Sequence, residues 1–313
     1  MTARVAYGER ARRTLIALAW VALYLAVGFL VWWVLNRINP VSIRSPWRNA
    51  SIWLSGCAAF GLATWLVGVR LGREPWDHWG WPLAHPGIAR PWMRGLGLGV
   101  LMAALTVGLA FVAGRARVWV TGEWSAYAAV AAPFALLLLV AALFEELVFR
   151  GYPLRRLADA VGPWAATAVF ATGFALAHLG NPAAGVFGIA NVALAGVWLS
   201  FAFFSPAGMP FAWGLHFGWN AGLALLFDAP VSGHRFFLPA VEYAPGRHAW
   251  VDGGAFGPEG GIVATIVLIA GTLAVLGGRL HCGLGIADCG LKGPHTQSAI
   301  RNPKSAIPKD RLV

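Results

Sequence analysis

An uncharged apolar run, closed by three ionisable side chains, lies near the middle of the chain. Residues Ala131 to Phe144 carry no charge, and Glu145, Glu146 and Arg150 follow directly after them. A helix of this composition is apolar enough for a bilayer, where an ionisable group costs roughly 3 to more than 10 kcal/mol. Such a group is rare in a membrane unless it faces a cavity and has a function. The stretch therefore indicates an intramembrane site, the alternative being charges that have already reached the lipid headgroups.

The rest of the chain has the same membrane character. The 313 residues are 58% hydrophobic and 12% charged, whereas soluble domains are about 25% charged. The 17 tryptophans fit this class because indole rings favour the membrane–water interface. We therefore predict an all-α fold, a polytopic membrane helix bundle of about eight transmembrane helices. They are expected at residues 15–35, 51–69, 95–113, 127–157, 163–179, 184–204, 210–227 and 262–280.

The net charge of +11 is better explained by orientation in a membrane than by nucleic-acid binding. The basic residues cluster beside the apolar helices and not on one soluble face. Most Lys and Arg residues fall in segments on the same side as the N-terminus, which the positive-inside rule assigns to the cytoplasm. We therefore expect a lipid bilayer and no nucleic acid as partner, with both termini on the cytoplasmic side of a bacterial inner membrane.

Three regions are expected along the chain. Residues 1–90 would form two transmembrane helices and a connection. The segment Arg70 to Arg94 carries tryptophans among prolines, glycines and charges, which is typical of a segment at the membrane interface. Residues 91–280 would form the functional core with its intramembrane cavity. Residues 281–313 are polar and would form a disordered cytoplasmic tail.

Polar side chains recur at helical spacing in three of the expected helices. The two members of each pair are four residues apart and share a helix face. The pairs are Glu146 with Arg150, Phe174 with His178, and His216 with Asn220. If helix four continues to Leu157 with a bend at Pro153, Glu145 and His178 rise to similar depths from one face, at 1.5 Å per residue. His216 lies only six residues past Pro210, so Glu145, His178 and His216 are expected to meet in one cavity if helix seven starts deep or the cavity is tall.

These residue types suit hydrolysis. A carboxylate in a cavity can act as general base on a water, and His and Asn can donate hydrogen bonds to the oxyanion of a tetrahedral intermediate. A metal held by Glu and His is the alternative within the same chemistry. The chain lacks the His-Glu-x-x-His zinc motif and the Gly-x-Ser-x-Gly nucleophile motif. His281, Cys282 and Cys289 fit no zinc spacing, and with Cys57 the cysteines form no disulfide framework.

Together these residues resemble the three motifs of the CAAX-protease and bacteriocin-processing family of intramembrane endopeptidases. The motifs are Glu145-Glu146-x-x-x-Arg150, Phe174-x-x-x-His178 and His216-x-x-x-Asn220, in this order on successive helices. The family includes the eukaryotic CAAX prenyl proteases, which remove the last three residues of prenylated proteins. The resemblance extends over about Pro91 to Leu280, and the segment 255–260 is similar to bacterial members.

The resemblance implies a role for each motif residue. The Glu145 carboxylate would activate the water. The residues that would position the water or stabilise the oxyanion are His178, His216 and Asn220, and those that would support the site are Glu146, Arg150 and Phe174. No cofactor is favoured, because neutral Asn is a poor zinc ligand. Zinc stays an alternative, with Glu145, His178 and His216 as its ligands.

Two other classes of function compete with an endopeptidase. A membrane scaffold or immunity protein would bind a partner without cutting it, and it need not retain Glu, His, His and Asn together. A small-solute transporter usually shows repeated halves and broken helices, and neither is visible here. The endopeptidase interpretation predicts a membrane-associated peptide or protein substrate, cut near its C-terminus. The identity of this substrate, and whether it is lipidated, stay open.

Overall fold

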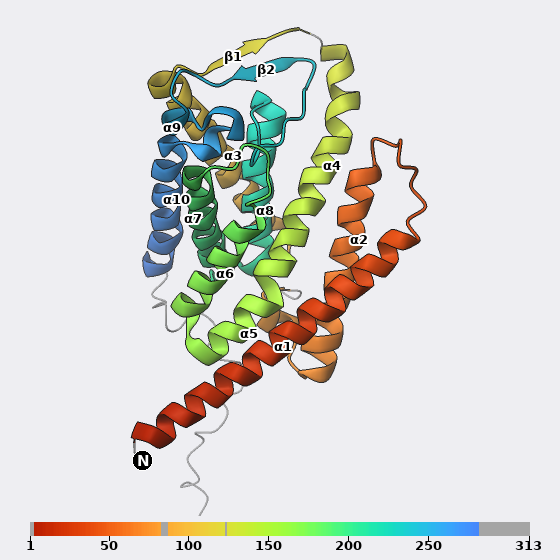
Figure 1. Ribbon diagram of the computed structural model, residues 1–313, viewed down its shortest axis with the longest axis vertical. Helices are drawn as coiled ribbons and strands as arrows, with labels where there is room; N and C mark the ends of the chain where they lie inside the picture. The colour runs from red at the N-terminus through yellow and green to blue at the C-terminus, as the bar shows by residue number, and fades with distance from the viewer. Residues whose placement is uncertain (1–2, 83–86, 123, 282–313) are drawn as a thin grey trace, which may run out of the picture.

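The computed structural model describes residues 3–82, 87–122 and 124–281, and most of this part is helical (Figure 1). The helices pack as one bundle, which confirms the predicted all-α fold. Its α-helices are α1 (Ala3–Arg37), α2 (Arg48–Ala63), α3 (Ala89–Gly114), α4 (Trp124–Phe149), α5 (Gly151–Val161), α6 (Pro163–Ala177), α7 (Val186–Phe203), α8 (Gly208–Ala221), α9 (Ala249–Asp252) and α10 (Ile262–His281). The predicted tail lies, from residue 282 onward, outside the described residues.

Short elements extend or connect these helices. The π-helical segments η1 (Thr64–Leu71) and η3 (Gly222–Leu226) continue α2 and α8, and the 3-10 turn η5 (Pro258–Gly260) precedes α10. The strands β1 (Arg117–Val120) and β2 (Val241–Ala244) pair antiparallel, with Arg117 opposite Ala244. This pair lies at one end of the bundle beside α9, away from the N-terminus of α1 (Figure 1). It ties the expected loop of residues 229–261 to the connection between α3 and α4.

The chain is an integral membrane protein, but fewer helices than predicted are long enough to span a bilayer. Five helical segments in the described part meet the length and hydropathy that a crossing needs, namely Gly8–Arg37, Arg48–Leu71, Ala89–Gly114, Trp124–Val161 and Val186–Phe203. Two shorter apolar helices accompany them, Pro163–Ala177 and Ile262–Gly277. The polytopic class is therefore confirmed, whereas the number of eight crossings is not. The orientation of the termini stays a prediction.

The predicted continuation of helix four is present, but its bend is not at Pro153. The α4 helix ends at Phe149, and Arg150 departs from helical geometry with φ −114° and ψ −94° before α5 begins. Proline lacks an N–H, and its ring crowds the carbonyl four residues earlier, which here belongs to Phe149. The break therefore falls one turn before the proline that causes it.

The short α6 helix ends inside the bundle. Its 15 residues span roughly 22 Å at 1.5 Å per residue, less than the hydrocarbon thickness of a bilayer. His178 closes its C-terminus, and the chain then turns toward α7. Backbone groups at such a depth need partners from the protein. The Asn181 side chain accordingly donates to the Ser232 carbonyl at 3.0 Å, so the 229–261 loop covers this turn.

The N-terminal helices α1 and α2 pack firmly on the helix that carries the acidic motif. The Tyr24 hydroxyl donates to the Leu147 carbonyl at 2.8 Å, and its ring stacks on Tyr152 at 4.8 Å between centroids. The ring centroids of Trp32 and Phe144 lie 4.7 Å apart, and both side chains belong to the same hydrophobic cluster as Tyr24. The helices α1 and α2 therefore share a hydrophobic core with α4 and α5. The division into the three predicted regions stays a prediction.

The segment predicted to lie at the membrane interface is partly in the core. Trp79 is 1% exposed, and its ring centroid lies 4.5 Å from that of Tyr152. Gly68 makes room for it, since a Cβ atom there would lie 2.7 Å from the indole nitrogen. Trp92 belongs to α3 and stacks on Phe217 at 5.8 Å. Both tryptophans thus pack against other parts of the bundle, and the interfacial location of the segment stays a prediction.

Helices α3 and α8 meet backbone to backbone through small residues. A Cβ atom on Gly218 would overlap the Leu96 carbonyl oxygen, and one on Gly214 would overlap that of Trp92. Gly95 and Gly99 make the reciprocal approach from α3. Small residues four apart allow this close contact between membrane helices. Because α8 carries His216 and Asn220, the contact also fixes the position of one wall of the candidate site.

Gly218→Ala is therefore expected to destabilise the fold. The added methyl has no space against the α3 backbone, and overpacking of this kind costs roughly 1–3 kcal/mol. Gly97→Ala is the matched control on α3, because nothing lies within 4 Å of a Cβ atom there. Thermal unfolding of the purified protein in detergent should show a lower midpoint for Gly218→Ala and an unchanged or higher one for Gly97→Ala. Equal midpoints for the two variants would refute the close α3–α8 contact.

Candidate active site

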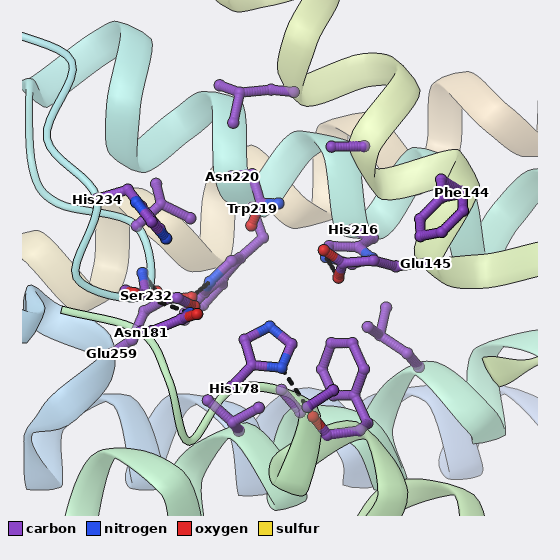
Figure 2. A pocket seen from close by; sticks show the side chains of 18 of the residues that line it. Phe144, Glu145, His178, Asn181, His216, Trp219, Asn220, Ser232, His234 and Glu259 are labelled. Atoms are coloured by element: carbon purple, nitrogen blue, oxygen red, sulfur yellow. Dashed lines mark hydrogen bonds and ion pairs between the residues drawn. The ribbon is translucent and has the colours of Figure 1, made fainter. Parts of the chain in front are cut away.

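A cavity of about 530 Å³ lies inside the bundle. Side chains of α2, α4, α7, α8, the end of α6 and the 229–261 loop line it. Glu145, His178, His216 and Asn220 are all among them, and Figure 2 shows them directed toward a common space. The structure thus brings together the four residues that sequence spacing placed on three separate helices.

The two adjacent glutamates lie in different environments. The Glu145 side chain is 24% exposed and lines the cavity. The Glu146 side chain is fully buried and does not line the cavity. Successive helix residues are rotated by about 100°, so neighbours cannot share one face. Only Glu145 is therefore open to a water or a substrate.

His216 connects the two carboxylates. Its Nδ1 lies 2.8 Å from Glu146 Oε1, and its Nε2 lies 3.6 Å from Glu145 Oε2. A carboxylate accepts hydrogen bonds, so the short contact is a donation from the Nδ1–H group to Glu146. This bond fixes the ring and leaves Nε2 facing the Glu145 carboxylate, and both residues line the cavity. Sequence spacing indicated no contact between Glu146 and His216.

Arg150 completes the buried part of the site. Its Nη1 donates to Glu146 Oε1 at 3.2 Å, and only 1% of its side chain is exposed. The guanidinium also lies 4.2 Å from the Phe174 ring centroid, a cation–π distance. The pairing of Glu146 with Arg150, predicted from their spacing, is thus present. Phe174 supports the site by covering this cation as well as by contacting His178 at 4.5 Å between ring centroids.

His178 is oriented by the helix that it terminates. Its Nδ1 lies 2.7 Å from the Phe174 carbonyl oxygen, one turn earlier in α6. A carbonyl can only accept, so the hydrogen is on Nδ1. In the neutral ring Nε2 then has a free lone pair, and Figure 2 shows the ring beside the cavity. His178 is therefore suited to accept a hydrogen bond from a water.

Asn220 lies one helical turn after His216 and lines the same cavity. Within residues 3–82, 87–122 and 124–281, no hydrogen bond engages its side-chain amide. Its two N–H donors thus remain available to a ligand.

The wall opposite Glu145 contains residues that were not among the predicted site residues, although Glu259 lies in the segment 255–260 that resembles bacterial family members. Glu259 of η5, Trp219 of α8 and Ser232 of the 229–261 loop line the cavity and are joined by hydrogen bonds (Figure 2). Asn49 and Trp53 of α2 line it from another side. A carboxylate within the sequence Gly-Pro-Glu-Gly before an apolar helix is a signal that could have identified Glu259. The α2 residues carry no such signal, because only tertiary packing brings them to the cavity.

Arg235 of the 229–261 loop and Asp228, just before this loop, carry charge. Burial raises the pKa of the Asp228 carboxyl, and the Leu238 amide and the Arg235 charge oppose this rise. The Arg235 guanidinium donates to the Tyr243 carbonyl at 3.2 Å and lies 5.1 Å from the centroid of the Phe237 ring. Its positive charge is thus held against other groups of the loop.

The zinc alternative gains no support from side-chain geometry. Among the residues that the structure describes, no three His, Cys, Asp or Glu side chains gather as metal ligands. The Nδ1 atoms of His178 and His216 are engaged by the Phe174 carbonyl and by Glu146, so only their Nε2 atoms would be available to a metal. His281 is the end of α10, and Cys282 and Cys289 lie outside the described residues.

Comparison with known proteins gives one match. Residues 127–222 match a protein-family model described as type II CAAX prenyl endopeptidase Rce1-like. No curated protein and no solved structure matches the chain. The matched segment is narrower than the resemblance expected over residues 91–280, but it contains all three motifs. It therefore falls on α4, α6 and α8, the helices that contribute Glu145, His178, His216 and Asn220 to the cavity.

Proposed function

We propose that this chain, whose residues 127–222 match the family model described as type II CAAX prenyl endopeptidase Rce1-like, cuts a peptide bond inside its cavity. The substrate would be a membrane-associated protein or peptide, cleaved near its C-terminus. One observation carries the proposal: Glu145, His178, His216 and Asn220 line a single cavity within a membrane helix bundle. The proposed location is a bacterial inner membrane.

Glu145 is the proposed general base. It is the motif carboxylate that reaches the cavity, and its closest described contact is the 3.6 Å approach to His216. In the proposed reaction it takes a proton from a water, and the resulting hydroxide attacks the carbonyl carbon of the scissile bond. The same carboxyl group would then return the proton to the leaving amine. Its hydrogen-bonding capacity is largely free for these tasks.

The histidines would have different tasks. His178 has its hydrogen on Nδ1, so its Nε2 lone pair can hold the attacking water by accepting a hydrogen bond. His216 is anchored through Nδ1 to Glu146, and when both ring nitrogens are protonated its Nε2–H can donate to the oxyanion. Asn220 would supply a second donor from the same helix face. Glu146 and Arg150 would hold His216 from behind the cavity wall.

The test of function is a search for peptides that appear only with the active protein. Cells carrying wild type or Glu145→Gln would be compared by proteomics of membrane-associated proteins and their released C-terminal fragments. We expect at least one fragment that is present with wild type and absent with the variant. Identical fragment sets at equal expression would favour a non-proteolytic scaffold or immunity protein instead.

Asn220→Asp separates the proposed oxyanion donor from a metal site. A carboxylate at this position would repel the oxyanion, so we expect cleavage to fall by about 10²–10³-fold, as for loss of an oxyanion-hole donor. An added carboxylate beside His216 would instead be tolerated by, or would strengthen, a metal site. Cleavage rates of the variant, together with zinc content and activity before and after chelation, decide the matter. Stoichiometric zinc, with activity lost on stripping and restored by zinc, would overturn the metal-free mechanism.

A further inference from the structure

A carboxylate outside the three motifs lies on the cavity wall. Glu259 belongs to η5 and lines the cavity beside Trp219 and Ser232 (Figure 2). Its Oε1 accepts from Trp219 Nε1 at 2.6 Å, and its Oε2 accepts from the Ser232 hydroxyl at 3.1 Å and from the Ser232 backbone N–H. No step of the hydrolysis proposed above uses the Glu259 carboxylate.

The backbone that presents Glu259 is rigidly held. Asn191 of α7 donates to the Glu259 carbonyl at 2.7 Å and to the Gly261 carbonyl at 2.9 Å, and it accepts from Thr265 at 2.7 Å. Gly257, just before this turn, has φ +97°, and a Cβ atom there would overlap the Pro230 carbonyl oxygen. The backbone around Glu259 is therefore fixed by contacts with other elements, and these contacts position the Glu259 side chain.

The negative charge of Glu259 has no cationic partner in the described part of the chain. None of the ion pairs there includes it. Its three hydrogen-bond donors are an indole, a hydroxyl and a backbone amide, and none carries charge. Arg235 lines the same cavity, but the Tyr243 carbonyl and the Phe237 ring engage its guanidinium. An uncompensated charge beside a membrane cavity marks a site whose partner comes from outside.

Figure 2 places Glu259 and Glu145 on opposite sides of Trp219 and Asn220. A peptide with its scissile carbonyl at Asn220 and Glu145 would thus extend neighbouring side chains toward Glu259, since an extended chain advances about 3.3 Å per residue. Apolar side chains that line the same cavity, among them Val231 and Phe236, would contact the methylene stem of a long basic side chain. Resting on the proposed peptidase function, we propose that Glu259 forms a subsite for a Lys or Arg side chain of the substrate.

A peptide library tests this subsite without knowledge of the natural substrate. The purified full-length protein in lipid nanodiscs would be incubated with random peptides, and the cut sites would be read by mass spectrometry. For wild type we expect Lys and Arg enriched at least ten-fold at one fixed position relative to the cut. Glu259→Gln should lower the ratio of Lys-containing to Gln-containing products at that position at least ten-fold. Absence of basic enrichment with wild type overturns the subsite, whatever the variant does.

Asp252→Asn is the matched control for Glu259→Gln. Asp252 is a buried carboxylate of the same loop that accepts from the Gly246 and Gly254 amides, and it does not line the cavity. The Asp252→Asn variant should leave the enrichment of Lys and Arg near the cut unchanged. Equal slowing of all peptides by Glu259→Gln would make Glu259 a positioning residue and overturn the subsite. No cleavage by wild type above the Glu145→Gln background would overturn the peptidase function itself, and the subsite with it.

Discussion

Glu145→Gln is expected to abolish peptide cleavage while leaving the protein folded. A neutral amide cannot take a proton from water, and loss of a general base typically lowers a rate by about 10²–10⁴-fold. The fold should tolerate the change because the side chain is 24% exposed and makes no close hydrogen bond in the described structure. Initial cleavage rates and thermal midpoints of the purified variant, beside wild type, measure both expectations.

Glu146→Gln is the matched comparison, since it makes the same chemical change one residue away. Glu146 is fully buried and accepts from Arg150 and His216. The variant should therefore unfold at a lower temperature and yet retain more activity per folded molecule than Glu145→Gln. The reverse order of activity, measured at equal folded fraction, would show that the two glutamates exchange the proposed roles.

Spacing along single helices predicts the local part of the site. Residues four apart share a helix face, which is why the sequence alone pairs Glu146 with Arg150 and His216 with Asn220. The same rule could have marked α3 and α8 as helices that pack closely on a partner, because Gly95 and Gly99, and Gly214 and Gly218, have the small-residue spacing of membrane helix pairs. The rule cannot say which two helices meet.

The tertiary part of the site lies beyond such reasoning. The hydrogen bond of His216 with Glu146 joins residues 70 apart, and that of Trp219 with Glu259 joins residues 40 apart. No helical period encodes a contact between separate elements. The break at Arg150 differs from the bend expected at Pro153, because a proline disturbs the helical turn that precedes it and not its own position.

Apolar composition alone does not fix the number of crossings, for a related reason. It treats every apolar run as a segment that crosses the bilayer. Helix α6 has only 15 residues, fewer than a crossing usually needs, and His178 at its C-terminus lines the cavity.

Arg150→Met should produce the largest loss of stability among the site variants. It removes the guanidinium that faces Glu146 at 3.2 Å in an environment where both side chains are at most 1% exposed. Removing one partner of a buried ion pair costs about 3–5 kcal/mol, because the other charge is left without compensation. The cation–π contact with Phe174 at 4.2 Å is lost as well. Unfolding of the purified protein in detergent should therefore occur at a much lower denaturant concentration than for wild type.

The double variant Arg150→Met, Glu146→Gln identifies the cause of that loss. If the uncompensated Glu146 charge is responsible, removing it restores part of the stability, so the double variant is more stable than the sum of the single changes predicts. The stability of Arg150→Lys should lie between that of wild type and that of Arg150→Met, because a lysine keeps the charge but lacks the planar group that covers the Phe174 ring. Strict additivity in the double variant would mean that Arg150 acts through packing at the α4–α5 break. The interaction between Arg150 and Glu146 would then contribute nothing to stability beyond the separate effects of the two side chains.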